Sequence, residues 1–464
     1  MTYAEAIDYL NGLARFGWRL GLDRMEALCD RLGHPERAYD SVHVTGTNGK
    51  GSTATFLAAI LQAAGYRTGL FTSPHLYDGR ERVRVNGEMI DEEEVCDLIE
   101  TLIPHITKVQ QQHGAITEFE AWTAAMFLDF ERHSVRTAVL EAGLGGRWDA
   151  TNVVWPRLAI LTNVSLDHTD RLGATVAEIG RDKAGIIKAN SKALVGTLPA
   201  DVRHEVETEA RLVRSRLYTL ASRNDNPPHG DPSTRFSWEL IGPSTLTLIR
   251  PDHTQMDLPF SGPRYQGRNA ALAAAAACIL STEDGYEIPD HAIESGLKTT
   301  IPGRFQVVLR EPEVILDAAH NPSAAAVLAA ELARGRVTPV SQPTTSPPLY
   351  PDLRMVFGAS SGHDAEGCLR ILGPLCREVI LTHAKTPRAR DPEELGRILA
   401  DLSIPFEIIP DVAKAVGTAV QRSRPVDRVC VTGSFFVLGE VPRPVLPPFA
   451  PELGDPPPQQ ASGK

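Results

Sequence analysis

The sequence predicts an α/β protein in which helices cover a parallel sheet. Three observations support this fold class: short β-branched runs alternate with longer helical patterns, several runs end directly at Gly, Asp, Glu or Asn, and a glycine-rich loop joins the first run to a helix. Ligands of open α/β sheets gather at the carboxyl ends of strands, so polar residues just after a run are candidate site residues. We predict strands at residues 41–45, 137–140, 158–162, 314–316, 355–357, 379–382 and 429–432.

The length of 464 residues predicts about two to four domains. We place a boundary after Ile301, because Pro302 and Gly303 interrupt the chain there and the strand and helix alternation restarts with Val314. This gives domains at 1–301 and 302–440, followed by a proline-rich tail at 441–464 that we expect to be disordered. We also expect surface loops at 222–232 and 339–352, and a buried alanine-rich helix at 270–280.

The composition argues against two kinds of partner. Lys and Arg number 47 against 58 Asp and Glu, a formal net charge of -11, which disfavours a broad phosphate-binding surface for nucleic acid. No apolar run reaches the roughly 18 residues of a membrane span, and the first residues lack the pattern of a secretory signal. We therefore expect a cytoplasmic protein without nucleic-acid or membrane partners, and we expect its six scattered cysteines to be buried free thiols.

The strongest local signal follows the first predicted strand. The loop GTNGKGST (46–53) leads into a helical run at 54–64 that is closed by Gly65. Glycines let backbone N–H groups approach phosphate oxygens, Lys50 adds a full positive charge, and Ser52 or Thr53 can support a metal. The spacing departs from the common phosphate loop, since Gly51 separates Lys50 from Ser52. A flexible glycine turn is the alternative.

Two further strand ends carry candidate metal ligands. Glu141 ends the strand at 137–140, and His168 follows the strand at 158–162. Carboxylate oxygens are the ligands that Mg²⁺ prefers, and two such residues next to a phosphate loop indicate a metal site. Taken alone, Glu141 would more often cap a helix or form a salt bridge, and the histidine would more often be structural. The pattern Thr175 to Glu178 predicts a capping box that starts a helix, on which Lys183 reads as a surface charge.

Taken in order, the motifs of this chain match those of one family. They are VTGTNGKGST (44–53), TSPHL (72–76), ERVRVNG (81–87), TEFE (117–120), EAGLGGRWDATN (141–152), LDH (166–168), DKAGIIK (182–188), PGRFQ (302–306), LDAAHNP (316–322), TGS (432–434) and GE (439–440). Over nearly its full length the chain resembles the folylpolyglutamate synthase/dihydrofolate synthase family, of the bacterial bifunctional type, within the Mur ligase superfamily.

The resemblance implies a fold and a set of cofactor contacts. It implies an N-terminal P-loop ATPase domain that also binds pterin, and a smaller C-terminal Rossmann-like ligase domain. By motif matching it assigns nucleotide contacts to Gly49, Lys50, Gly51, Ser52, Asn269, Arg304 and Asp317, the last three across the domain cleft. It assigns Mg²⁺ ligation to Ser73, Glu141, His168 and Lys183, with two ions expected and Lys183 carbamylated by CO₂. Lys50, Lys183 and His168 would be the catalytic residues.

The resemblance also implies the acceptor site. The pterin would lie near Thr117, Glu118, Phe119 and Glu120, with Phe119 available to stack, and near Trp148, Asp149 and Ala150. Family members often carry Leu where Trp148 stands and Glu where Asp182 stands, so the pterin contacts follow the family pattern less closely than the ATP contacts. In the C-terminal domain a family lysine is replaced by His363, which removes one expected phosphate contact.

The implied reaction is ATP-dependent addition of L-glutamate to dihydropteroate, to the γ-carboxylate of tetrahydrofolate, or to both. Phosphoryl transfer from ATP would activate the acceptor carboxylate as an acyl phosphate, the glutamate amine would attack it, and ADP and phosphate would be released. The expected partners are these small molecules, and we expect a monomer. The alternatives are a monofunctional folylpolyglutamate synthase, a P-loop NTPase switch that forms no amide, and a cell-wall Mur ligase, which usually has a further N-terminal domain before its phosphate loop.

Overall fold

The computed structural model describes residues 1–14, 19–223, 225, 231–242, 244–334 and 353–442. Two compact units divide the chain, Met1–Ile301 and Pro302–Lys464. Of the predicted segments, 339–352 and 443–464 lie outside the described residues, as does most of 222–232. Among the residues described, no helix is long and apolar enough to cross a membrane.

The first unit is built on a mixed sheet, which has eleven strands among its described residues, in the order β11-β10-β9-β8-β7-β6-β1-β5-β2-β3-β4. The central pairs from β2 to β9 are parallel, and antiparallel pairs extend the sheet at both ends. The strands are β1 (Asp40–Thr45), β2 (Thr68–Phe71), β3 (Val83–Val85), β4 (Glu88–Met89), β5 (Thr137–Glu141), β6 (Leu158–Leu161), β7 (Lys192–Val195), β8 (Arg216–Ser222), β9 (Arg235–Ile241), β10 (Thr245–Ile249) and β11 (Gln255–Pro259).

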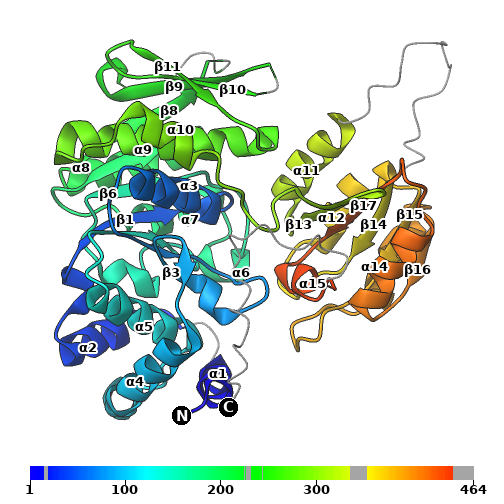
Figure 1. Ribbon diagram of the computed structural model, residues 1–464, viewed down its shortest axis with the longest axis horizontal. Coiled ribbons are helices and arrows are strands. Elements are labelled where there is room, and N and C mark those ends of the chain that lie inside the picture. Colours follow the sequence, from blue (N-terminus) through cyan, green and yellow to red (C-terminus); the bar gives the residue numbers. More distant parts are fainter. Residues whose placement is uncertain (15–18, 224, 226–230, 243, 335–352, 443–464) are drawn as a thin grey trace, which may run out of the picture. The chain divides into compact units, whose positions relative to one another are not determined.

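Helices cover both faces of this sheet (Figure 1). They are α1 (Tyr3–Ala14), α2 (Asp23–Leu32), α3 (Lys50–Ala63), α4 (Glu92–His113), α5 (Glu118–Arg132), α6 (Thr169–Leu172), α7 (Val176–Ala184), α8 (Ala200–Leu212), α9 (Gly267–Asp284) and α10 (Asp290–Gly296). The side chains of β5 alternate between two cores: Val139 packs with α3, α9 and α10, whereas Ala138 and Leu140 pack with α4 and α5. Each face of β5 is therefore buried, as expected for a central parallel strand.

The alanine-rich segment forms the middle of α9. Residues 269–280 of this helix are all buried, and its many small side chains allow it to pack closely against both the sheet and the neighbouring α3. This confirms the buried helix that the sequence predicts at 270–280.

The helix after the phosphate loop is also present, but it begins at Lys50, four residues earlier than the apolar run suggests.

The second unit contains a six-stranded sheet among the residues described, with order β12-β13-β17-β14-β15-β16 and one antiparallel pair, β12 with β13. Its strands are β12 (Gln306–Arg310), β13 (Glu313–Asp317), β14 (Leu353–Phe357), β15 (Glu378–Leu381), β16 (Phe406–Ile408) and β17 (Arg428–Thr432). Its helices are α11 (Pro322–Arg334), α12 (Ala365–Leu372), α13 (Pro392–Asp401), α14 (Val412–Gln421) and α15 (Phe435–Gly439). The α/β fold class is confirmed in both units.

All seven predicted strands are present, within about two residues of their predicted ends. The sequence did not reveal the antiparallel ribbon of β9, β10 and β11, because its strands are not uniformly apolar. In β11, for example, exposed and buried residues alternate. All six cysteines are free, as predicted, but only four are buried, since Cys96 and Cys376 are partly exposed.

Candidate active site

Three neighbouring strand ends of the larger sheet converge at the glycine-rich loop. The loop leaves β1, and β1 lies between β5 and β6, with Val44 paired to Glu141 and Thr45 paired to Leu161. The carboxylate that ends β5 and the polar segment that follows β6 therefore flank the loop. This is the arrangement that the strand-end argument predicts.

The loop has a fixed conformation that only glycine permits at two positions. Gly46 and Gly49 have φ values of 149° and 84°. A methyl group on Gly46 would lie 1.9 Å from Oγ1 of Thr162, and one on Gly49 would lie 2.4 Å from Oδ1 of Asn269. The side chains of Thr162 and Asn269 occupy the space that a Cβ would need, so glycine lets them pack directly against the loop backbone.

Hydrogen bonds from the segment after β6 hold the tip of the loop. The carbonyl of Asn48 accepts from Oγ1 of Thr162 and from Nδ2 of Asn163, each at 2.7 Å, and its N–H donates to Oδ1 of Asn163 at 3.1 Å. The N–H of Thr47 donates to the carbonyl of Asn163 at 2.9 Å. The loop is thus a cradle tied to the sheet, which disfavours the alternative of a flexible turn.

Lys50 and Lys183 bring two amines to the same loop carbonyl. Nζ of Lys50 donates to the carbonyls of Gly46 and Thr47 at 3.2 and 3.3 Å, and Nζ of Lys183 donates to the carbonyl of Gly46 at 2.9 Å. Lys50 is also the first residue of α3, whose N-terminus adds positive partial charge. Lys50 and the N-terminus of α3 therefore supply the positive charge expected of an anion site.

Lys183 is buried, contrary to its interpretation as a surface charge from helical spacing alone. Its side chain is 3% exposed, and burial, followed by the charge of Lys50, lowers its pKa to about 7. The predicted capping box of Thr175 and Glu178 is confirmed and starts the helix that carries this lysine. A large fraction of Lys183 is therefore a neutral, nucleophilic amine near neutral pH.

Glu141 is a buried carboxylate that contacts the segment at Ser73 and the glycine-rich loop at Gly51. Its Oε2 accepts a hydrogen bond from the N–H of Ser73 at 2.9 Å. A methyl group on Gly51 would lie 3.0 Å from the same oxygen. The structure therefore brings Ser73, Glu141 and the start of α3 together, and the extra glycine of the loop gives the carboxylate room.

His168 follows β6 as predicted and immediately precedes α6. It adopts a left-handed backbone with φ 48°, and its side chain is 29% exposed, with Nε2 3.9 Å from Oδ1 of Asp167. The ring is half-exposed rather than packed in a core. It is therefore accessible to a ligand.

The first turns of α3 and α9 are joined through a residue that the sequence motifs did not highlight. Ser52, 4% exposed, accepts a hydrogen bond from Nε2 of Gln266 at 3.1 Å, and Oε1 of Gln266 accepts one from Nδ2 of Asn269 at 2.8 Å. The sequence offered one signal for Gln266: it stands three residues before Asn269, at the start of the alanine-rich helix. Two of the predicted nucleotide contacts, Ser52 and Asn269, are thus connected by Gln266.

In the segment predicted to bind pterin, two residues have clear structural contacts. Thr117 and Glu120 form the capping box of α5, in which Oε2 of Glu120 accepts from both the N–H and Oγ1 of Thr117 at 2.8 Å. The other oxygen of Glu120 pairs with Arg24 at 2.9 Å in a buried ion pair. These contacts explain both residues without a ligand.

The two residues between them face different neighbours. Phe119 packs against Phe71 with ring centroids 5.8 Å apart, and its ring lies against Gly143, where a methyl group would be 2.6 Å away. Glu118 forms an ion pair with Arg82 at 3.1 Å. Phe119 therefore lies beside the loop that follows Glu141.

The second predicted pterin segment contains one organising carboxylate. Asp149 is buried, and it accepts from the N–H groups of Leu144 and Thr151 at 2.9 and 3.0 Å, while burial raises its pKa. Ala150 is also buried, whereas Trp148 is 44% exposed. Asp149 fixes the loop after β5, and Trp148 is the large side chain that this loop leaves open to a ligand.

Arg304 and Asp317 belong to the second unit. Asp317, at the end of β13, accepts from the N–H groups of Phe305 and Ala319 at 2.9 and 3.0 Å. The guanidinium of Arg304 lies over the ring of Phe435, 4.8 Å from its centroid. Asp317 therefore fixes the backbone of Phe305, the residue that follows Arg304, and this brings the two motif residues close together within the second unit.

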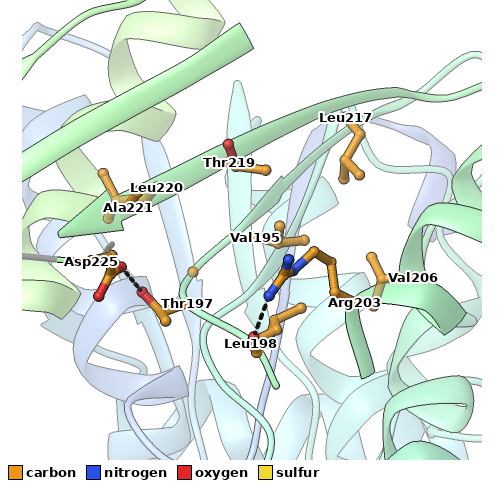
Figure 2. A pocket seen from close by; sticks show the side chains of 11 residues that line it. Val195, Thr197, Leu198, Arg203, Val206, Leu217, Thr219, Leu220, Ala221 and Asp225 are labelled. Atoms are coloured by element: carbon orange, nitrogen blue, oxygen red, sulfur yellow. Dashed lines mark hydrogen bonds between the residues drawn. The ribbon is translucent and has the colours of Figure 1, made fainter. Parts of the chain in front are cut away.

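A small cavity of about 20 Å³ lies near the ends of β7 and β8. Figure 2 shows Thr197 bonded to Asp225, at 3.2 Å, and Arg203 reaching the carbonyl of Leu198, at 3.3 Å. Most of its walls are apolar, and its volume is that of about one water molecule. It is too small for a nucleotide or a folate.

Comparison with known proteins identifies related chains. The family model of the Mur ligase middle domain matches residues 44–277, and that of the Mur ligase, glutamate ligase domain matches residues 303–435. The dihydrofolate synthase/folylpolyglutamate synthase of Bacillus subtilis is 39% identical over 328 residues, which are 69% of this chain and 74% of that protein.

Two solved structures are similar over almost the whole chain. The E. coli FolC structure in complex with DHPP and ADP has a TM-score of 0.79 at 30% identity, covering 95% of this chain and 96% of that one. The bifunctional folylpolyglutamate synthase/dihydrofolate synthase of Yersinia pestis, complexed with AMPPNP and Mn ion, has a TM-score of 0.77 at 30% identity, covering 95% of this chain and 97% of that one.

Proposed function

This chain belongs to the folylpolyglutamate synthase/dihydrofolate synthase family of Mur ligases, and from that premise we propose that it adds L-glutamate both to dihydropteroate and to the γ-carboxylate of tetrahydrofolate. As a member of this family it is an ATP-dependent, amide-forming ligase. The observation that carries the proposal is the convergence of the tied glycine cradle, two lysines and a buried carboxylate at one edge of the larger sheet.

ATP is the proposed phosphate donor, and the cradle fits its phosphates. Gly46 and Gly49 adopt positive φ values and let Thr162 and Asn269 pack against the loop, which fixes the backbone in a compact turn whose N–H groups could bind phosphate oxygens. Lys50 and the N-terminus of α3 supply the opposing charge. A nucleotide with a divalent metal in the Yersinia relative supports the same use here.

The donor set around Glu141 fits Mg²⁺. The Glu141 carboxylate, held by the N–H of Ser73, lies against the start of α3, which carries Ser52. Carboxylate and hydroxyl oxygens are hard donors of the kind Mg²⁺ requires. We propose Ser73, Glu141 and His168 as ligands, and bound Mg²⁺ would neutralise charge on the transferring phosphoryl group.

Lys183 is the proposed carbamylated residue. Its neutral Nζ would add to the carbon of CO₂, forming a C–N bond and losing a proton to water, to give a carbamate. Burial favours this because it holds the pKa of the amine at about 7, where the nucleophilic form is well populated. The carboxylate so formed would offer oxygen donors to a second Mg²⁺ ion.

The chemistry of amide formation explains why ATP is needed. A carboxylate is a poor electrophile, so the acceptor carboxylate would attack the γ-phosphorus of ATP, releasing ADP and forming an acyl phosphate. The amine of L-glutamate would then add to the acyl carbon, and phosphate would leave as the amide forms. Lys50 would stabilise the charge of the transferring group throughout.

The remaining motif residues have proposed roles in binding. Asn269, Arg304 and Asp317 are nucleotide contacts, and Phe119 and Trp148 are the pterin contacts that best fit their positions beside the loop after β5. Thr117, Glu118, Glu120, Asp149 and Ala150 would shape that site. We propose a monomer that acts in the cytoplasm on small molecules.

The test is ADP release and product mass with Mg²⁺, ATP and L-glutamate, comparing dihydropteroate, tetrahydrofolate and no acceptor. A bifunctional enzyme adds one glutamate to dihydropteroate and at least one to tetrahydrofolate; turnover of tetrahydrofolate alone would indicate a monofunctional synthase. The variant Lys50→Ala should lose about 100-fold in rate or more, whereas the exposed Lys298→Ala should not change. ADP release that needs neither acceptor nor glutamate would contradict bifunctional ligation and favour an NTPase switch.

A further inference from the structure

Gln266 lies behind the phosphate loop, buried to 3% exposure, and no motif assigns it a role. We propose that Gln266 is a positioning residue for phosphoryl transfer, which holds the Ser52 hydroxyl so that one oxygen lone pair faces the metal and nucleotide. The inference rests on the proposed function, since it takes Ser52 as a contact of the Mg²⁺ and ATP site.

The orientation of the Gln266 amide is set by its two partners. Its Oε1 accepts from Nδ2 of Asn269 at 2.8 Å, so its NH₂ group faces Ser52, and Nε2 donates to Oγ of Ser52 at 3.1 Å. A hydroxyl has two acceptor lone pairs and one donor hydrogen. The bond from Gln266 occupies one lone pair and leaves the other lone pair and the hydrogen for a ligand.

The backbone around Ser52 does not compete for that hydrogen. A serine or threonine in a helix commonly donates to the carbonyl four residues earlier, as Thr55 does to Gly51 at 2.7 Å. For Ser52 that carbonyl belongs to Asn48, and it already accepts from Thr162 and Asn163 at 2.7 Å each. Because both lone pairs of the Asn48 carbonyl oxygen are in use, the hydrogen bond from Gln266 sets the orientation of the Ser52 hydroxyl.

The same bonds tie the phosphate loop to α9. Asn269, the second partner of Gln266, has its Oδ1 against the Cα of Gly49, where even a methyl group would not fit. The chain from Asn269 through Gln266 to Ser52 therefore links both ends of the turn that starts α3. A change at Gln266 should act through Ser52 rather than through contact with the reacting atoms.

The test is nucleotide binding by calorimetry, with a non-hydrolysable ATP analogue, in the presence and absence of Mg²⁺. The variant Gln266→Leu should weaken binding about tenfold with Mg²⁺ and much less without it, since one hydrogen bond in a charged site is lost. The matched control is Gln62→Leu, a residue of α3 whose side-chain amide donates to the carbonyl of the exposed Asn86 at 2.8 Å, and it should bind as the wild type does.

A double-variant cycle separates positioning from a general structural role. In a Ser52→Ala background, Gln266→Leu should have no further effect on Mg²⁺-dependent affinity, because the hydroxyl it turns is gone. Equal losses in both backgrounds, or equal losses with and without Mg²⁺, would overturn the proposal. If Gln266→Leu does not fold, Gln266→Asn, whose amide is too short to reach both partners, is measured in the same cycle.

The binding measurement also keeps this proposal apart from the proposed function. Mg²⁺-dependent affinity that depends on Gln266 and Ser52, in a protein that forms no amide, would support the positioning role and reject the ligase activity. Amide formation by the wild type, with unchanged Mg²⁺-dependent binding in Gln266→Leu, would support the ligase activity and reject the positioning role of Gln266.

Discussion

The Cα of Gly51, in the first turn of α3, lies against the carboxylate of Glu141 at the end of β5, so that a methyl group there would be 3.0 Å from Oε2. This contact explains why the loop of this chain has a glycine between its lysine and its serine. Any side chain at position 51 would push against a buried, hydrogen-bonded carboxylate that has little freedom to move.

The variant Gly51→Ala should therefore lose ligase activity while keeping its fold. Because the methyl group displaces Glu141 from its place beside Ser73, we expect kcat/KM to fall about tenfold or more, measured by ADP release. The matched control is Gly12→Ala, in α1, where nothing lies within 4 Å of the added methyl group and activity should not change. Full activity in Gly51→Ala would show that this contact does not constrain the carboxylate.

Lys183 should react reversibly with CO₂ in a pH-dependent way. Burial and the charge of Lys50 hold its pKa at about 7, so the reactive neutral amine is lost as the pH falls below about 7. Native mass spectrometry in bicarbonate should show the mass of one added CO₂ at pH 8, and the adduct should decline on acidification.

The variant Lys183→Met should show no adduct and little activity. If the carbamate supplies a carboxylate, added acetate should restore part of the activity of Lys183→Ala, whose smaller side chain leaves room for it. An adduct of the same size in Lys183→Met would place the reactive amine elsewhere.

Glu120 should matter for stability more than for the acceptor. The variant Glu120→Gln removes the buried carboxylate that pairs with Arg24, whose other ion-pair partner, Asp23 at 3.6 Å, is exposed, so we expect the free energy of unfolding to fall by about 3 kcal/mol in urea titrations. The exposed Glu93→Gln should change it little. A raised KM for dihydropteroate at unchanged stability would instead assign Glu120 to the acceptor site.

His43 should make the larger unit less stable in acid. Burial lowers its pKa to about 3, compared with about 6.5 in an unfolded chain, so the unfolded state alone gains a proton between these values. Stability is then lost as the pH falls below about 6.5, by about 2 kcal/mol at pH 5. The variant His43→Gln, which can keep a hydrogen bond to Thr151, should lose less on acidification. Equal losses in both proteins would contradict this origin.

Much of the fold could be predicted because its signals are local. The runs that became β1, β5 and β6 are apolar and β-branched, and each is buried on both faces. The ribbon of β9 to β11 escaped prediction because its partly exposed strands depend on pairing with one another. The capping box of Thr175 and Glu178 could be predicted from its local spacing. The buried ion pair of Glu120 could not, since its partner Arg24 stands 96 residues away in the sequence.

The sequence by itself determined the chemistry that is available: a glycine-rich loop with Lys50 after a strand, a carboxylate at the next strand's end, and the motifs of a glutamate ligase family. Only the tertiary structure decided what surrounds each group. Lys183 reads as a surface charge along its helix, yet folding buries it against Gly46 and so lowers its pKa. Gln266 belongs to no motif, and its contact with Ser52 joins residues 214 positions apart. Burial and long-range hydrogen bonds depend on how distant segments pack, and no local pattern encodes them.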